Sequence, residues 1–252
     1  MTSTSDSKKK KDGGFLETAQ VIFQALLIAL VIRTFLFQPF NIPSGSMKDT
    51  LLIGDYLFVS KYSYGYSRFS FPFSPDLFSG RIFSSQPDRG DVVVFKLPRD
   101  HDVDYIKRVI GMPGDKIQMI DGWLHINGQP VQRERLSDIE QDDGTGRMVP
   151  VKRWRETLPN GVSYTILDMV DNGFYDNTPV YEVPLGHYFM MGDNRDNSAD
   201  SRVLSQVGYV PFENLIGKAQ MIFFSIKEGG SAWQVWNWPW MVRWDRLFTT
   251  VN

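Results

Sequence analysis

The first clear pattern along the chain is a long apolar stretch close to its start. Residues 18–32 carry no charged side chain, and the apolar run continues past Arg33 to Phe37. A helix needs about 20 apolar residues to cross the hydrocarbon core of a bilayer, which is about 30 Å thick. We therefore predict one transmembrane helix over residues 15–37, in which the long side chain of Arg33 reaches the headgroups.

A basic tail precedes this stretch. Residues 1–14 are small and polar and include four consecutive lysines from residue 8, which predicts a solvated tail. Positive residues stay on the cytoplasmic side of a membrane segment, so the chain after residue 38 is expected on the outer side. A cleaved export signal and a buried core helix are the alternatives. Against cleavage, residues 33–43 contain no small-x-small processing site.

After Pro43 the pattern changes to short β-like runs bounded by turn residues such as Asn127-Gly128. This spacing predicts a mainly β fold with an antiparallel β-sheet body at residues 38–120 and 185–252. The more polar residues 121–184 predict a β-rich insertion, with hairpin tips at residues 142–146 and 159–161. The runs expected to form strands are residues 56–61, 91–96, 105–110, 116–120, 123–126, 187–191 and 220–225.

Composition and charge narrow the classes of function. The 252 residues include 27 Lys plus Arg and 29 Asp plus Glu, a formal net charge of −2, so no nucleic-acid partner is expected. Without Cys the chain has no disulfide, no thiol nucleophile and no Cys-ligated zinc. His101, His125 and His187 lie without metal-ligand spacing, which favours neither a zinc site nor a Ser-His-Asp triad.

Two aromatic segments stand out in the β region. Residues 62–78 are rich in Tyr and Phe, and residues 233–244 hold five tryptophans. Trp and Tyr rings lie favourably at the level of the lipid headgroups, so both segments could contact the bilayer. Ordinary core packing is the alternative.

The turn at residues 43–47 (Pro-Ser-Gly-Ser-Met) is the first candidate for chemistry. Gly45 lets the backbone approach a ligand closely, and the hydroxyl of Ser44 could donate to an oxyanion formed at Ser46. A Ser-Gly-Ser sequence alone is more often only a turn.

A strand lysine is the second candidate. Alternation along residues 105–110 places Lys107 on one face with Tyr105 and Val109. A lysine among apolar groups loses hydration, so its pKa falls and it can act as a neutral base. Lys107 could thus deprotonate a serine, although an exposed strand lysine is the commoner arrangement.

A dense polar segment at residues 190–202 is the third candidate. It predicts either a hydrogen-bonded network or a solvated loop. The segment does not match an EF-hand calcium loop: counted from Asp196, the sixth position is Ser201 rather than Gly, and the twelfth is Val207 rather than Glu.

Together these segments resemble the bacterial type I signal peptidases (leader peptidases), membrane-anchored Ser/Lys-dyad serine proteases that remove signal peptides from exported proteins. The matching motifs are PSGSM with LLIGD, RGDVVVFKLP through DYIKRVIGMPGD, and MGDNRDNSADSR, in that order, and the similarity runs from Gln38 to about Lys227. Many family members have two membrane segments and some have a Cys pair, whereas here there is one predicted segment and no Cys.

The resemblance implies roles for individual residues. Ser46 would be the nucleophile, Lys107 the general base, and Ser44 the partner of the Ser46 backbone N–H in the oxyanion hole. Ser198 resembles the family serine that orients the lysine. The implied structural ion pairs are Asp193 with Arg108 and Asp200 with Arg202. The residues that it places around the substrate pockets are Phe40, Ile42, Met47, Leu51, Val94, Phe95, Tyr105 and Ile106.

The resemblance also implies a function. The chain would cut preproteins after small-x-small sites, without a metal or cofactor, from a catalytic β domain outside a bacterial inner (cytoplasmic) membrane. It would act on signal peptides, contact the lipid bilayer and have a functional link to the export translocon. A non-catalytic, membrane-tethered envelope scaffold is the alternative, which the presence of both Ser46 and Lys107 disfavours. A self-cleaving Ser/Lys regulator shares the dyad but does not account for the membrane helix.

Overall fold

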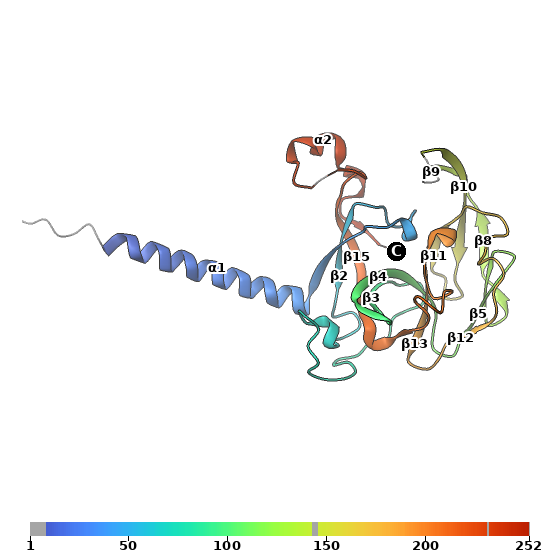
Figure 1. Ribbon diagram of the computed structural model, residues 1–252, viewed down its shortest axis with the longest axis horizontal. Helices are drawn as coiled ribbons and strands as arrows, with labels where there is room; N and C mark the ends of the chain where they lie inside the picture. Colours follow the sequence, from blue (N-terminus) through green and yellow to red (C-terminus); the bar gives the residue numbers. More distant parts are fainter. Residues whose placement is uncertain (1–8, 143–145, 231, 252) are drawn as a thin grey trace, which may run out of the picture.

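The computed structural model describes residues 9–142, 146–230 and 232–251 (Figure 1). A long helix, α1 (Lys9–Phe35), extends away from a β-rich body. Within it, Gly14–Phe35 is long and apolar enough to cross a membrane and is not buried against the body. The alternative of a buried core helix is therefore wrong.

The bounds of α1 differ from the predicted residues 15–37. The helix begins inside the predicted basic tail, because lysine is a favourable helix residue and an existing helix extends at little cost. It ends at Phe35, and the chain continues directly as a strand, since Pro39 disfavours helical backbone in the residue before it. Residues 1–8 of the predicted tail lie outside the described residues.

The body is organised around one large sheet with the strand order β1-β2-β15-β3-β4-β13-β14, and β16 pairs with β15. Its pairings are antiparallel, as the alternating pattern predicted. The bounds are β1 (Phe37–Asn41), β2 (Asp55–Ser60), β3 (Val92–Leu97), β4 (Asp100–Gly111), β13 (His187–Met191), β14 (Val210–Pro211), β15 (Leu215–Ser225) and β16 (Thr249–Thr250).

Two smaller sheets lie beside the large one. The first contains β5 (Lys116–Ile120), β6 (Trp123–Ile126), β7 (Gln129–Pro130) and β12 (Tyr181–Glu182). The second contains β8 (Gln132–Arg135), β9 (Ile139–Asp142), β10 (Met148–Thr157) and β11 (Ser163–Asp168). The predicted tip at residues 159–161 joins β10 to β11. Most of the other predicted tip, residues 142–146, lies outside the described residues.

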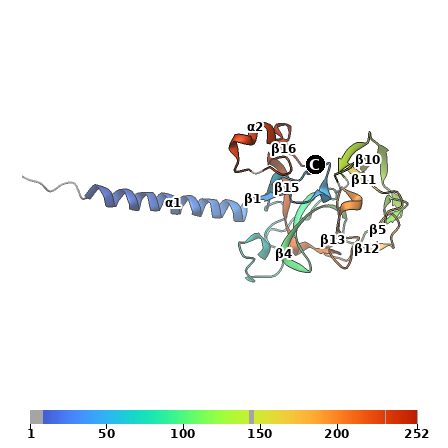
Figure 2. The same cartoon turned by 45° about the horizontal axis from the view of Figure 1, so that its top comes forward.

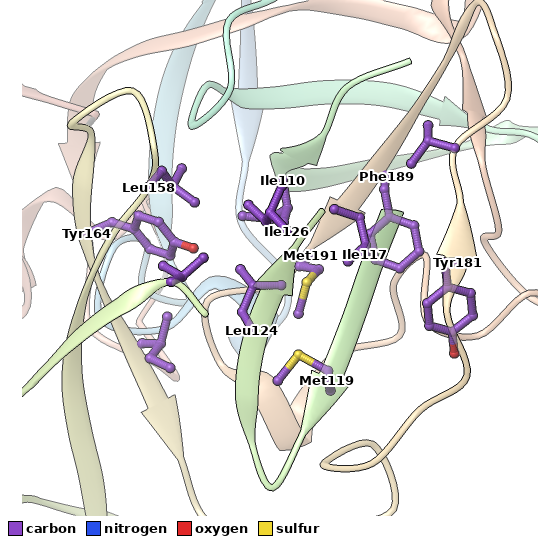
Figure 3. Close-up of a cluster of buried hydrophobic side chains, with 13 residues drawn as sticks. Ile110, Ile117, Met119, Leu124, Ile126, Leu158, Tyr164, Tyr181, Phe189 and Met191 are labelled. Carbon is purple, nitrogen blue, oxygen red and sulfur yellow. The ribbon is translucent and has the colours of Figure 1, made fainter. Parts of the chain in front are cut away.

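One buried apolar cluster connects the large sheet to the smaller ones (Figure 3). Ile110 and Phe189 from the large sheet pack in the same cluster as Ile117, Leu124 and Ile166 from the smaller sheets. Strand β5 also pairs with β6 across the predicted boundary at residue 120. The predicted insertion therefore shares its core with the body.

Hydrogen bonds connect the end of α1 to the body. The backbone N–H of Lys61 donates to the carbonyl of Leu36 at 2.9 Å, and the hydroxyl of Tyr66 donates to the carbonyl of Phe35 at 2.9 Å. Only Leu36 separates the last residue of α1 from the first residue of β1.

The two aromatic segments differ in exposure. In residues 62–78, Tyr64 and Phe69 are buried in the apolar clusters of the body. In contrast, Phe73 is fully exposed, and Trp233 and Trp240 are mostly exposed. The Trp-rich segment forms α2 (Trp238–Met241), which lies on the side of the body that α1 joins in both orientations (Figures 1 and 2). Core packing therefore accounts for Tyr64 and Phe69 of the first segment but not for the exposed rings of Phe73, Trp233 and Trp240.

Candidate active site

Ser46 lies in a short 3-10 helix, Gly45–Met47, which residues 42–44 connect to the end of β1. The Ser46 side chain is buried, and the turn is held from one side by Asn194. The Asn194 backbone N–H donates to the Ser46 carbonyl at 3.1 Å, and its side-chain amide donates to the Gly45 carbonyl at 3.0 Å. The polar segment at residues 190–202 thus fixes the backbone around Ser46.

Lys107 reaches Ser46 from the middle of β4. Its Nζ lies 2.7 Å from the Ser46 Oγ and 2.9 Å from the carbonyl of Ile106. The side chain is buried, with Nζ 5.2 Å from the centre of the Tyr105 ring. The alternation of β4 therefore brings together the serine and the lysine that were selected from separate motifs.

Burial lowers the pKa of Lys107 from its ordinary value to about 8. The carboxylates of Asp200 and Asp193 act in the opposite direction, but burial dominates. At neutral pH about a tenth of the molecules then carry the uncharged amine, which can accept a proton.

The carboxylates of Asp193 and Asp200, near Lys107, form ion pairs with arginine side chains rather than with Lys107. Arg108 donates to both oxygens of Asp193, at 2.9 and 2.7 Å, and Arg202 donates to both oxygens of Asp200, at 2.9 and 2.8 Å. All four side chains are buried. Because each carboxylate has a guanidinium partner, neither forms an ion pair with Lys107 in the described part of the chain, so its amine is less strongly held in the charged form.

The two other predicted serines are placed differently. The Ser44 Oγ lies 3.4 Å from the Ser46 Oγ, close enough to face the same reacting atom. The Ser198 hydroxyl is buried and makes no hydrogen bond to Lys107 within the described residues. It lies near Asp200, where burial acts to raise the pKa of the carboxyl but the Arg202 guanidinium holds that pKa below its ordinary value.

Gly192, to which the sequence analysis assigned no role, lies close to both Ser198 and Ser46. A Cβ atom on Gly192 would lie 2.2 Å from the Ser198 Oγ and 2.6 Å from the Ser46 carbonyl oxygen. Any side chain here would displace one or both serines. The signal in the sequence was a glycine directly after a strand, which the pattern alone could only explain as a turn residue.

The insertion also supports the site. Arg195 of the polar segment forms a buried ion pair with Glu156 of β10, and the hydroxyl of Tyr164 donates to the same carboxylate. Arg153 of β10 pairs with Asp49, three residues after Ser46, at 3.0 Å. The sequence analysis found none of these contacts, because their partners are far apart in the chain.

A cleft of about 520 Å³ opens beside Ser46 and Lys107. It lies between residues 40–46 and residues 103–107. Five of the predicted pocket residues line it: Phe40, Ile42, Val94, Tyr105 and Ile106. The other three, Met47, Leu51 and Phe95, are fully buried in the apolar cores. The lining residues that the sequence analysis did not select include Val103, Asp104, Asn197 and Ala199.

Both walls of the cleft carry open strand edges. Strand β1 pairs only with β2, and β13 pairs with β4 only from Arg108 onwards. Within the described residues, the backbone of residues 40–42 and 103–106 therefore has one side available for an added strand. An extended peptide could pair with these edges by backbone hydrogen bonds.

Comparisons with known proteins point to one family. The family model described as signal peptidase, peptidase S26, matches residues 15–224. The signal peptidase I of Rickettsia typhi (strain ATCC VR-144 / Wilmington) is 50% identical over 211 residues, which cover 80% of this chain and 77% of that protein. The signal peptidase I of Rickettsia massiliae (strain Mtu5) is 46% identical over 235 residues, covering 90% and 83%.

A solved structure also matches. The crystal structure of a signal peptidase I from Enterococcus faecalis V583 is 27% identical in sequence and covers 53% of this chain and 97% of its own. Its TM-score of 0.31 is too low for the two structures to be compared position by position.

Proposed function

Since the chain belongs to the signal peptidase family, peptidase S26, we propose that it is a membrane-anchored serine endopeptidase that removes signal peptides from exported preproteins. In this proposal Ser46 is the nucleophile and Lys107 is the general base. The observation that carries it is the 2.7 Å contact between the Lys107 Nζ and the Ser46 Oγ in a buried position beside an open cleft.

The reaction is acyl transfer followed by hydrolysis. The uncharged amine of Lys107 accepts the hydroxyl proton as the Ser46 Oγ attacks the scissile carbonyl carbon. The backbone N–H of Ser46 and the hydroxyl of Ser44 donate to the resulting oxyanion. Lys107 then gives its proton to the departing amine of the mature protein. In the second step the same amine takes a proton from water, which attacks the acyl ester. Lys107 then gives that proton to the Ser46 Oγ as the ester bond breaks, which restores the free serine and the uncharged amine.

Small apolar pockets account for the proposed small-x-small specificity. The cleft beside Ser46 is lined by apolar side chains such as Ile42, Val94 and Ile106. An Ala-sized side chain can pack against such a surface, whereas a large one would need the walls to move.

The proposed topology is single-pass. Helix α1 crosses the inner membrane with its basic start in the cytoplasm, and the β body lies on the outer side. Residues 38–120 and 185–252 form the catalytic domain, and residues 121–184 support it.

Incubation of the full chain in detergent with a preprotein that carries an Ala-x-Ala site tests the proposal. Mass spectrometry should identify a new N-terminus directly after that site, and the Ser46→Ala variant should give none. No cleavage by the wild-type chain would contradict the proposal and favour the non-catalytic scaffold. Equal cleavage by Ser46→Ala would exclude Ser46 as the nucleophile.

The rate should depend on pH through Lys107. Below its pKa of about 8 the amine is protonated and cannot accept a proton, so we expect kcat/KM to rise about tenfold per pH unit up to about pH 8 and then to level off. The measurement is kcat/KM for a peptide substrate across this range, with circular dichroism to verify that the fold is unchanged. A flat profile between about pH 6 and pH 8 would exclude Lys107 as the base.

Gly192→Ala should lower the cleavage rate by about 100-fold or more, because the added methyl group displaces Ser46 and Ser198. Gly128→Ala is the matched control: its φ of +78° strains an alanine, but a Cβ there meets no atom within 4 Å. That variant should lose some stability and keep its activity. Wild-type cleavage by Gly192→Ala would show that the close approach at this position is not needed.

A further inference from the structure

A second, smaller pocket of about 140 Å³ lies where α1 enters the body. Three cationic side chains line it: Arg33 from the last turn of α1, Lys61 directly after β2, and Lys96 from β3. The only acidic side chain in its lining is Asp104, which pairs with Lys96 at 2.9 Å. The proposed catalytic reaction uses none of these four residues.

The positive charges of Arg33 and Lys61 are only partly balanced by protein, because the nearby carboxylate of Asp104 is paired with Lys96. Within the described residues, neither Arg33 nor Lys61 forms an ion pair with a carboxylate. Lys61 is only 2% exposed, and its Nζ donates to the carbonyl of Ser70. Burial and the nearby charge of Arg33 lower the pKa of Lys61 to about 8, although the carboxylate of Asp104 acts in the opposite direction. A buried lysine beside a second cation is costly unless an anion joins them.

The surroundings of the pocket place it at the surface of a bilayer. Arg33 also borders an apolar groove of about 860 Å³ that includes Ala29 and Ile32 of α1 and Phe58 of β2. The fully exposed ring of Phe73 also borders the basic pocket. Apolar surface that lies at the end of a membrane helix faces lipid, so an anion here meets the headgroup region.

We propose that this pocket binds the phosphate group of an anionic phospholipid, with Arg33 and Lys61 as its main contacts. A guanidinium group can donate two hydrogen bonds to a phosphate, and a lysine ammonium adds a point charge. The inference rests on the proposed anchoring of α1 in the membrane. Asp104 borders both this pocket and the catalytic cleft, so a bound headgroup would hold the cleft side of the body against the membrane.

Native mass spectrometry of the full chain in detergent tests the proposal. The chain is titrated with phosphatidylglycerol, with zwitterionic phosphatidylcholine and, without lipid, with inorganic phosphate. We expect a retained phosphatidylglycerol adduct, weakened about fivefold in Lys61→Met and in Arg33→Gln, since each variant removes one cation near the headgroup. Lys116→Gln, a change at an exposed lysine on β5, is the control and should bind phosphatidylglycerol like the wild type.

The outcomes separate the sources of phosphate. Equal adducts with both lipids, or undiminished phosphatidylglycerol binding by both variants, would overturn the proposal. Arg33 is exposed on its helix, so Arg33→Gln remains informative even if Lys61→Met fails to fold. Saturation by inorganic phosphate alone would assign the pocket to free phosphate and also overturn it.

The test is independent of the proposed protease activity, because counting adducts requires no turnover. Flotation of wild type and variants with phosphatidylcholine vesicles reports separately whether α1 anchors the chain. Failed anchoring and failed headgroup binding are thereby distinguished.

Discussion

Replacement of Lys107 with Met should abolish cleavage of signal peptides, with a loss of kcat on the order of 10⁴-fold or more. Methionine fills a similar volume in the buried site but has no nitrogen to accept the Ser46 proton, which lies 2.7 Å away in the wild type. Lys107→Arg should be equally inactive, because a guanidinium does not release its proton in a protein. The measurement is the single-turnover cleavage rate of a preprotein.

The matched control is Lys116→Met, which changes an exposed lysine that pairs with Glu182 far from the cleft. It should cleave at the wild-type rate. Circular dichroism and thermal unfolding of Lys107→Met should resemble those of the wild type, since an uncharged side chain suits this buried position. Cleavage by Lys107→Met within about tenfold of the wild type would mean that another group takes the proton.

Asp193→Ala should lower the free energy of unfolding by about 3–5 kcal/mol. Asp193 accepts two hydrogen bonds from Arg108 and one from the hydroxyl of Thr50 at 2.6 Å. With the carboxylate removed, the fully buried Arg108 guanidinium loses the charge and the two hydrogen-bond acceptors that Asp193 supplies. Urea unfolding followed by tryptophan fluorescence measures the change.

The control for this prediction is Asp138→Ala, which removes the carboxylate of an exposed pair with Arg135. Exposed pairs contribute little, so its unfolding free energy should change by less than about 1 kcal/mol. If both variants lost the same small amount, the buried pair would not be a main stabilising contact of the site.

Much of the fold could be predicted because local patterns of apolar and turn residues indicate where strands begin and end. The predicted runs at residues 116–120, 123–126 and 187–191 coincide with β5, β6 and β13, since each is a short apolar run bounded by turn residues. The start of β4 was missed: the strand begins at Asp100, in a charged stretch without alternation. Pairing with β3 holds that stretch in the strand despite its composition.

The candidate site was predictable where its residues lie in short motifs. The turn containing Ser46 and the strand containing Lys107 could each be recognised alone. The residues that hold these motifs in place could not be recognised from the sequence. Asn194 forms a hydrogen bond to the carbonyl of Ser46, 148 residues earlier in the chain, and Glu156 of the insertion pairs with Arg195. Such contacts depend on tertiary packing, which local patterns in a single sequence do not predict.

Pocket assignments were limited by strand geometry. Val94 and Phe95 are consecutive in β3, which is paired on both sides, so their side chains point to opposite faces. Val94 faces the cleft and Phe95 faces the core. When a run of consecutive residues is assigned to a pocket by resemblance, strand geometry therefore places only alternate side chains in the cleft and the others in the core.

The direct connection between α1 and β1 has a consequence for which bonds can be cut. Because the backbone of Leu36 is bonded to Lys61 and the strand starts at once, the helix and the cleft cannot tilt freely relative to each other. In a membrane-anchored chain the catalytic pair would stay at a constant height above the lipid. A preprotein would then be cut only where its extended segment reaches that height, so distance from the bilayer would select the cleavage site together with side-chain size.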